Sequence, residues 1–332
     1  MKLIDVAELS PRLEGSWAGG AVERLLGIDS FNAFYERARS GDTATPFLQR
    51  CLDDLEVKYD VQGHENFAAL ASGPCIVAAN HPFGAVEAVL LLHLLQQVRS
   101  DAKIMANYLL MKVPEVAHGL IGVDPFASEG SLQSNIRPIR EAMRHLKSGG
   151  VLGMFPSGTV SHWHLRQRGI TDPPWSSHVA VLAQRTGASV IPVYFHGKNG
   201  WGFQLAGLIH PLIRTALLPR ELMNKRGQAM SVTVGKVIPK RQLSRFADPE
   251  RLTAFVRAST YLLRESDATA GAPKPGVAME PIAPAVSQDL LVQEIDALPT
   301  EAKLLAKEGF EVWVVAYCQA PNLVKEVGRL RE

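Results

Sequence analysis

One histidine lies between two apolar segments, in a position that suits a reacting base. Residues 75–79 are short, apolar and β-prone, residues 88–95 read as a buried helix, and His81 lies between them. In α/β folds the carboxyl ends of the strands form the edge that binds ligands. Glu87 falls in the first turn of the predicted helix, where negative charge is favoured. A carboxylate there can fix the tautomer of the imidazole and leave its other nitrogen free to take a proton, which makes the pair a candidate general base.

The same residues also fit an interpretation without chemistry. The run from Asn80 to Gly84 can be a simple turn in which the glycine supplies an unusual backbone angle. A single histidine beside apolar sequence is more often a packed side chain than a catalyst. His81 alone therefore leaves both interpretations open.

A second segment with the same organisation favours catalysis. Residues 149–155 read as an apolar strand that ends at Pro156 and Gly158, and small hydroxyl residues follow. The glycine allows close approach of the backbone, while Ser157, Thr159 and exposed N–H groups are suited to hold an oxyanion or a phosphate. Alone, this segment would be an ordinary turn at the end of a strand.

Together the two segments resemble the glycerophospholipid acyltransferase family, which acylates lysolipids from thioesters. That family has an Asn-His block with a downstream acid, followed by a Phe-Pro-x-Gly block, in the order found here. Glu87 lies six positions after His81, one more than in the commonest pattern. This form is similar to the hemolysin-like branch, which includes lyso-ornithine-lipid O-acyltransferases. The similarity covers about residues 65 to 245 and extends to further blocks at 122–126, 172–175, 190–199, 217–227 and 234–239.

The resemblance implies an acyltransferase with His81 as general base and Glu87 as its orienting acid. The donor would be an acyl-carrier-protein or coenzyme A thioester, with no other cofactor and no metal. The residues predicted to bind substrate all lie in the two segments and are Asn80, Gly84, Phe155, Pro156, Ser157, Gly158 and Thr159.

Departures from the family pattern bear on the acceptor. Members that accept glycerol phosphates usually carry Arg in the second block, whereas residues 123–125 are Val-Asp-Pro. Ser157 replaces the usual Glu of the Phe-Pro block, and Val160 stands where an Arg often follows. These differences favour a zwitterionic or amino-acid lysolipid such as lyso-ornithine lipid. A 1-acylglycerol-3-phosphate or lysophospholipid acyltransferase remains the alternative.

The length and composition predict a large α/β domain with an appendage. The chain has 332 residues, of which 46% are hydrophobic, enough for a substantial core. We expect a central, mainly parallel or mixed sheet flanked by helices, with helices before it and a linked C-terminal appendage. The expected divisions are a helical segment at 1–64, the acyltransferase domain at 65–265, a Pro/Ala/Gly linker at 266–286 and a final segment at 287–332. The final segment resembles the opening of an ornithine N-acyltransferase domain.

The charges are unevenly distributed. Residues 161–260 hold fourteen Lys and Arg but four Asp and Glu, in a chain whose net charge is +2. Such a region suits an anionic membrane surface or an acidic acyl carrier protein. No nucleic-acid-binding module accompanies it. The start lacks a secretory signal, and no apolar run reaches the length of a membrane span, so we expect a cytoplasmic protein, peripheral on the inner face of the cell membrane. The family resemblance further implies a bacterial protein.

Three rival functions were also considered from the sequence. A serine hydrolase lacks support because no Gly-x-Ser-x-Gly motif is present. His162, His164 and His178 offer a metal site that no carboxylate or cysteine pattern supports. A catalytically inactive lipid-binding protein on the same scaffold is the non-enzymatic rival.

The three cysteines, Cys51, Cys75 and Cys318, read as buried or incidental thiols in a reducing compartment.

Overall fold

The chain forms two compact units, residues 1–271 and residues 272–332. The computed structural model describes residue 3 and residues 16–71, 73–124, 132–164, 169–200, 203–204, 216–270, 284–307, 310–315 and 317–329.

The larger unit is built on a sheet that has seven strands in the described part of the chain, in the order β1-β9-β8-β2-β5-β3-β4. Neighbouring strands are parallel except β8 and β9, which are antiparallel. The strands are β1 (Lys58–Gln62), β2 (Cys75–Ala79), β3 (Lys103–Asn107), β4 (Leu120–Val123), β5 (Val151–Met154), β8 (Ser189–Phe195) and β9 (Ala229–Val234). The predicted α/β class with a mainly parallel, mixed sheet is confirmed.

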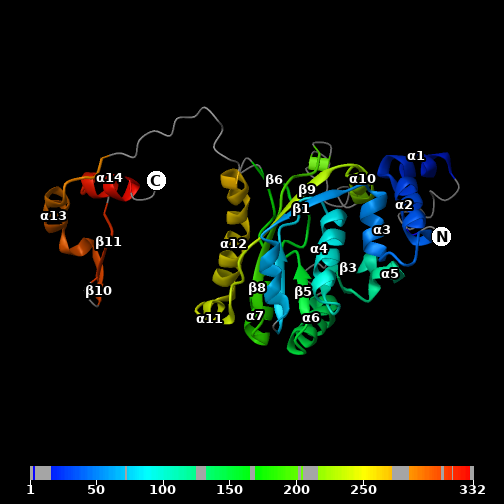
Figure 1. The fold of residues 1–332 in the computed structure, drawn as a ribbon, viewed down its shortest axis with the longest axis horizontal. Helices are drawn as coiled ribbons and strands as arrows, with labels where there is room; N and C mark the ends of the chain where they lie inside the picture. The colour runs from blue at the N-terminus through cyan, green and yellow to red at the C-terminus, as the bar shows by residue number, and fades with distance from the viewer. Residues whose placement is uncertain are drawn as a thin grey trace. The chain divides into compact units, whose positions relative to one another are not determined.

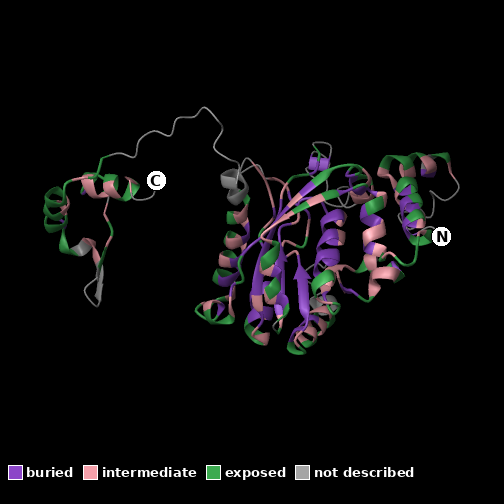
Figure 2. Cartoon of the chain, in the orientation of Figure 1, coloured by how far each residue is buried: buried purple, intermediate pink, exposed green. Residues whose placement is uncertain are grey.

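Helices cover both faces of this sheet (Figure 1). One face is covered by α3 (Phe47–Asp54), α4 (Ala85–Val98) and the 3-10 helix η3 (His64–Ala71). The other is covered by α6 (Leu132–Lys147), α7 (His178–Thr186), α11 (Lys240–Leu243) and α12 (Pro249–Ala270). Buried residues are concentrated in the strands and on the sides of the helices that face them (Figure 2).

Strand β2 shows why this sequence forms a central strand. All five of its residues are buried. Cys75, Val77 and Ala79 contribute to the core under α4, while Ile76 and Ala78 contribute to the core under α7. A strand covered on both faces needs a continuous apolar run, which is what the sequence supplies.

The N-terminal part of the larger unit is continuous with the sheet. Helices α1 (Trp17–Leu26) and α2 (Ile28–Ser40) precede α3, and α10 (Leu218–Met223) packs against α2. Strand β1 lies within the expected helical segment 1–64 but pairs with β9, with Lys58 opposite Ala229. The alternating, partly polar sequence of β1 is that of an edge strand, which apolar runs alone do not reveal.

Shorter elements complete this unit. They are η4 (Tyr108–Lys112), α5 (Pro114–Ala117) and the two-stranded sheet of β6 (His162–His164) and β7 (Gly169–Thr171). Helix α12 continues to Ala270, past position 266 where the linker was expected to begin. Residues 271–283 of that expected linker lie outside the described residues.

The smaller unit contains α13 (Gln288–Asp296), η6 (Thr300–Ala302), β10 (Lys303–Lys307), β11 (Phe310–Trp313) and α14 (Pro321–Arg329). Strands β10 and β11 pair antiparallel. Leu298 and Ala320 are its buried apolar residues within the described ranges.

None of the helices in the described ranges combines the length and the hydropathy needed to cross a bilayer.

Candidate active site

The two segments singled out in the sequence meet at one edge of the sheet. Strands β2 and β5 are parallel neighbours, with Ala78 opposite Met154, so the residues after each strand emerge side by side. His81 follows β2 and Phe155 follows β5. Their rings stack with centroids 4.3 Å apart and an interplanar angle of 26°. This contact fixes one face of the imidazole against an apolar surface.

The carboxylate of Glu87 lies beside His81 and holds the turn that carries it. Oε1 of Glu87 accepts hydrogen bonds from the backbone N–H groups of Phe83 and Gly84, both at 2.7 Å. The same oxygen lies 3.0 Å from Nδ1 of His81. This is an ion-pair distance without the alignment of a hydrogen bond, and Oε2 has no hydrogen-bond partner among the described residues.

The burial of this pair assigns a direction to the imidazole. The Glu87 side chain is fully buried, whereas that of His81 is 16% exposed. Because Nδ1 is buried on the carboxylate side, Nε2 is the nitrogen left to meet a substrate. A positive charge formed on the ring would lie directly beside the buried carboxylate, which is the arrangement that a general base needs.

Gly84 is required for the geometry of this turn. Its φ of 112° lies in a region that favours glycine, and it forms the N-cap of α4. A Cβ at this position would come within 2.8 Å of Cδ2 of Leu218 on α10. Gly84 therefore contributes through its backbone N–H to Glu87 and through its lack of a side chain.

Asn80 occupies a different role from the predicted contact with substrate. Its Nδ2 donates to the carbonyl of Phe195 at 2.9 Å, and its Oδ1 accepts from the N–H of Phe195 at 2.7 Å. Both polar groups are therefore engaged in joining the ends of β2 and β8, and the residue is buried. It supports the backbone immediately before His81.

The turn after β5 retains some of the predicted hydrogen-bond donors. The N–H of Gly158 closes the turn onto the carbonyl of Phe155 at 3.0 Å, and Oγ of Ser157 donates to the carbonyl of Thr159 at 2.9 Å. Neither of these two groups is free for an oxyanion. Within the described ranges, the backbone N–H groups of Ser157 and Thr159 carry no hydrogen bond, so they remain as candidate donors. Pro156 is buried, and its carbonyl accepts from the N–H of Ser176 at 2.8 Å.

Asp172 joins the two segments and was not among the predicted site residues. Its Oδ1 accepts from the N–H of His81 at 3.1 Å and from Oγ of Ser161 at 2.5 Å, and its Oδ2 accepts from Nε1 of Trp175 at 2.9 Å. The N–H of Ser161 donates to the carbonyl of His81 at 2.7 Å. A buried carboxylate with three donors thus fixes the backbone of His81 from behind. The sequence feature that could have identified Asp172 as a site residue is its position in the Asp-Pro-Pro-Trp block at 172–175.

The histidines considered for a metal site do not form one in the described part of the chain. No group of three His, Cys, Asp or Glu residues suited to hold a metal ion occurs there.

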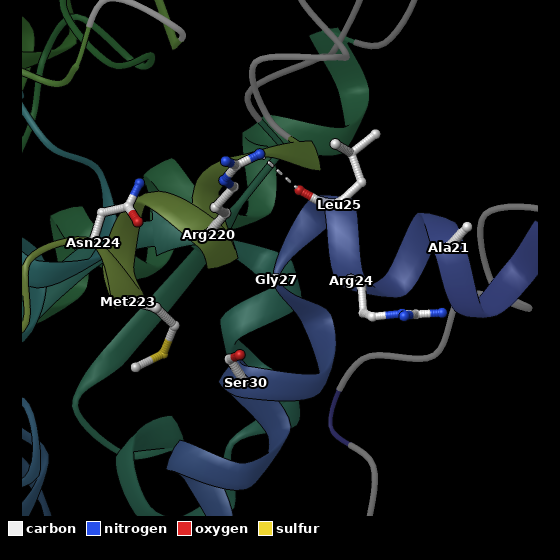
Figure 3. A pocket seen from close by; sticks show the side chains of 8 residues that line it. All are labelled: Ala21, Arg24, Leu25, Gly27, Ser30, Arg220, Met223 and Asn224. Carbon is white, nitrogen blue, oxygen red and sulfur yellow. Dashed lines mark hydrogen bonds between the residues drawn. The ribbon is translucent and has the colours of Figure 1, made fainter.

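A separate open hollow of about 650 Å³ lies between α1, α2 and α10. Figure 3 shows Arg24, Leu25 and Ser30 on one side and Arg220, Met223 and Asn224 on the other. Nη1 of Arg220 donates to the carbonyl of Leu25 at 3.2 Å. None of the predicted site residues lines this hollow.

Residues 30–271 match the family model described as Acyltransferase. The chain is 28% identical over 251 residues to a lyso-glycine lipid O-acyltransferase of Phocaeicola vulgatus, covering 73% of this chain and 86% of that protein. It is 26% identical over 250 residues to a lyso-glycine lipid O-acyltransferase of Bacteroides thetaiotaomicron, covering 73% of this chain and 88% of that protein. The crystal structure of PlsC, a 1-acyl-sn-glycerophosphate acyltransferase from Thermotoga maritima, aligns with a TM-score of 0.43 and 19% identity over 76% of this chain and 89% of that one.

Proposed function

The chain belongs to the Acyltransferase family, and from this premise we propose that it transfers a fatty acyl group from a thioester to the hydroxyl of an amino-acid lysolipid. The family-level resemblance seen in the sequence is thereby confirmed. The observation that carries the proposed chemistry is the contact of 3.0 Å between Nδ1 of a partly exposed His81 and Oε1 of a buried Glu87.

In the proposed reaction, Nε2 of His81 takes the proton of the lysolipid hydroxyl as its oxygen attacks the thioester carbon. Glu87 stabilises the imidazolium that forms, at a distance that keeps the two charges in contact. The developing oxyanion accepts hydrogen bonds from the N–H groups of Ser157 and Thr159. When the carbon–sulfur bond breaks, the imidazolium returns the proton to the departing thiolate. The products are an ester and a free thiol, and no further cofactor is consumed.

Two observations support an amino-acid lysolipid as acceptor. Two relatives with similar sequences over most of the chain are named for acylating lyso-glycine lipid. The Val123-Asp124 pair, at the end of β4, also stands where family members that accept glycerol phosphates usually carry an arginine. Lyso-ornithine lipid belongs to the same chemical class. We infer that the enzyme accepts an N-acylated amino acid in preference to lysophosphatidic acid.

We further infer that the reaction takes place at a membrane surface. Trp17 and Leu25 of α1 are 88% and 60% exposed, and both residue types favour the boundary between water and lipid. The excess of Lys and Arg in residues 161–260 supports binding to anionic lipid. The thioester donors, carried by acyl carrier protein or coenzyme A, are made inside the cell, which favours the inner face of the membrane.

The test is acyl transfer by purified protein presented with lyso-glycine lipid, lyso-ornithine lipid or lysophosphatidic acid in mixed micelles. Both thioester donors are supplied in turn, and lipid products and released thiol are measured. We expect an O-acylated amino-acid lipid that disappears in His81→Ala, because general-base help contributes about 10²–10⁴ in rate. Turnover restricted to lysophosphatidic acid would replace the proposed acceptor. A folded protein that binds lysolipid without turnover on any acceptor would identify an inactive scaffold.

A further inference from the structure

Lys225 is a largely buried lysine within electrostatic reach of Glu87, the acid that contacts the candidate base. It follows α10 and is 5% exposed, and its Nζ lies 4.8 Å from the ring centroid of Phe83. Within the described ranges no acceptor receives a hydrogen bond from this ammonium, and no carboxylate lies within ion-pair distance. A cation–π contact covers one side of the ammonium, and its N–H donors receive no acceptor from the described residues. Burying such a group is costly unless something pairs with it.

Opposing influences act on the Lys225 ammonium. Burial lowers the pKa of the Lys225 ammonium, and the carboxylates of Glu221 and Glu87 act in the opposite direction. Glu221 is itself buried and accepts a hydrogen bond from Nδ2 of Asn224 at 3.2 Å. The ammonium therefore lies in a negative field but in contact with neither carboxylate, so its donors point to something other than these two residues.

Phe83 connects Lys225 to the reacting groups. Its N–H donates to Oε1 of Glu87, the oxygen that contacts His81. Its carbonyl accepts from Nδ2 of Asn199 at 2.9 Å, and Oδ1 of that buried amide has no partner among the described residues. Phe83 is thus surrounded by a cation and an amide oxygen that both retain unused hydrogen-bonding capacity. Such groups in a buried site indicate a polar ligand.

We propose that Lys225 binds the carboxylate of the acceptor's amino-acid headgroup and thereby sets the preference of the enzyme for this class of lysolipid. This inference rests on the proposed function. An amino acid acylated on its nitrogen retains its carboxylate, which carries one negative charge and accepts hydrogen bonds from an ammonium. With that partner in place the cation is neutralised, and the headgroup is held beside Phe83, whose N–H binds the acid that contacts His81.

The same surroundings disfavour a phosphate monoester. A phosphate monoester carries up to two negative charges, which one ammonium does not neutralise, and the nearby carboxylates of Glu87 and Glu221 supply no compensating positive charge. A phosphate is also best held by several donors or by the planar fork of arginine, whereas Lys225 offers one point charge. A single ammonium therefore matches a carboxylate ligand better than a phosphate.

The test compares lyso-glycine lipid with its methyl ester, which keeps the shape of the headgroup and removes its charge. Wild type, Lys225→Met and Lys225→Arg are compared, with Lys236→Met as the matched control because Lys236 is an exposed cation. We expect wild type and Lys236→Met to prefer the free acid by about 10- to 100-fold in kcat/KM, the range for one hydrogen bond to a charged group. In Lys225→Met the ratio of acid to ester kcat/KM should fall to about one. Lys225→Arg should restore part of the preference for the acid.

Several outcomes would overturn the assignment. One is equal acylation of lyso-glycine lipid and its methyl ester by the wild-type enzyme, a result that can be obtained without any variant. Another is a folded Lys225→Met protein that keeps the full preference, or that loses both acceptors equally. A change confined to the KM of the thioester would place Lys225 at the donor instead. Equilibrium binding of the acid and the ester to His81→Ala, with and without Lys225→Met, decides the question if turnover is lost. If wild type acylates no amino-acid lysolipid at all, the proposed function itself fails, which is a separate result.

Discussion

Replacing Glu87 by glutamine isolates the charge beside His81 from the architecture around it. The amide oxygen introduced by Glu87→Gln can still accept from the N–H groups of Phe83 and Gly84, so the cap of α4 is retained. What disappears is the negative charge 3.0 Å from Nδ1 of His81. Because the ring becomes positive only during proton transfer, this loss acts on the transition state more than on the resting enzyme.

The size of the effect follows from that distance. Two unit charges 3.0 Å apart at an effective dielectric constant of about 20 attract by about 5.5 kcal/mol, which is an upper limit. The net value is smaller, about 1.5–3 kcal/mol, because solvation of the separate charges offsets part of the attraction and the amide dipole of glutamine replaces part of the rest. We therefore expect kcat to fall by about 10- to 100-fold, with KM for the acceptor little changed. His81→Ala should fall further, by about 10²–10⁴-fold.

The assay is single-turnover acyl transfer, with thiol release followed in the same sample so that binding and chemistry are separated. Glu65→Gln is the matched control because it removes one carboxylate from an exposed position. Thermal unfolding monitors the fold of each protein. Wild-type turnover in folded Glu87→Gln would refute the reasoning, because the charge would then make no contribution. A loss as complete as that of His81→Ala would also refute it, since it would give Glu87 more than a supporting role.

Three further predictions concern the frame around the site. Asp172→Asn leaves one acceptor oxygen for three donors, so we expect denaturant unfolding to show a loss of about 1–3 kcal/mol and steady-state kinetics to show a larger fall in kcat than rise in KM. Burial raises the pKa of Cys51 to about 12 and that of Cys75 to about 11, while Cys318 is exposed; a thiol reagent should label Cys318 in the native protein and all three in denaturant. Burial lowers the pKa of His93 below 6.5. As the pH falls below about 6.5 the unfolded chain therefore binds this proton before the folded protein does, and the free energy of unfolding decreases. Urea unfolding between pH 7.5 and 5 should show that the free energy of unfolding of His93→Gln depends less on pH than that of wild type.

Local features of the sequence were enough to predict the central part of the site. The run from Cys75 to Glu87 contains a continuous apolar strand, a turn with glycine and a helix whose first turn carries an acid. Each of these signals spans a few residues and depends on local backbone preference. The contact between His81 and Glu87 follows from them, because the turn leaves the carboxylate few positions other than beneath its N–H groups. That the turn carrying His81 works together with the turn at Phe155 was predicted from the resemblance to the acyltransferase family.

Long-range contacts account for what the sequence did not indicate. Asn80 reads as a polar residue beside a catalytic histidine, yet its amide is engaged by Phe195, 115 positions away. Asp172 lies 91 positions from His81, and only the fold brings its carboxylate to that N–H group. Strand β1 escaped notice because an edge strand alternates, and its partner β9 comes near the end of the larger unit.

Lys225 shows most clearly why charge counts along a sequence can mislead. It is one of the fourteen basic residues in 161–260, which together suggest a solvated surface facing anionic lipid. The fold instead buries it against Phe83, within the fields of Glu87 and Glu221. A cation on the surface strengthens binding to any anionic lipid and is screened by salt, whereas a buried one selects a particular charged group and is screened little. Raising the salt concentration should therefore weaken attachment to anionic vesicles while leaving the ratio of acid to ester acylation unchanged. If the two declined together, Lys225 would be acting as part of the surface charge, and headgroup selection would have to originate elsewhere in the site.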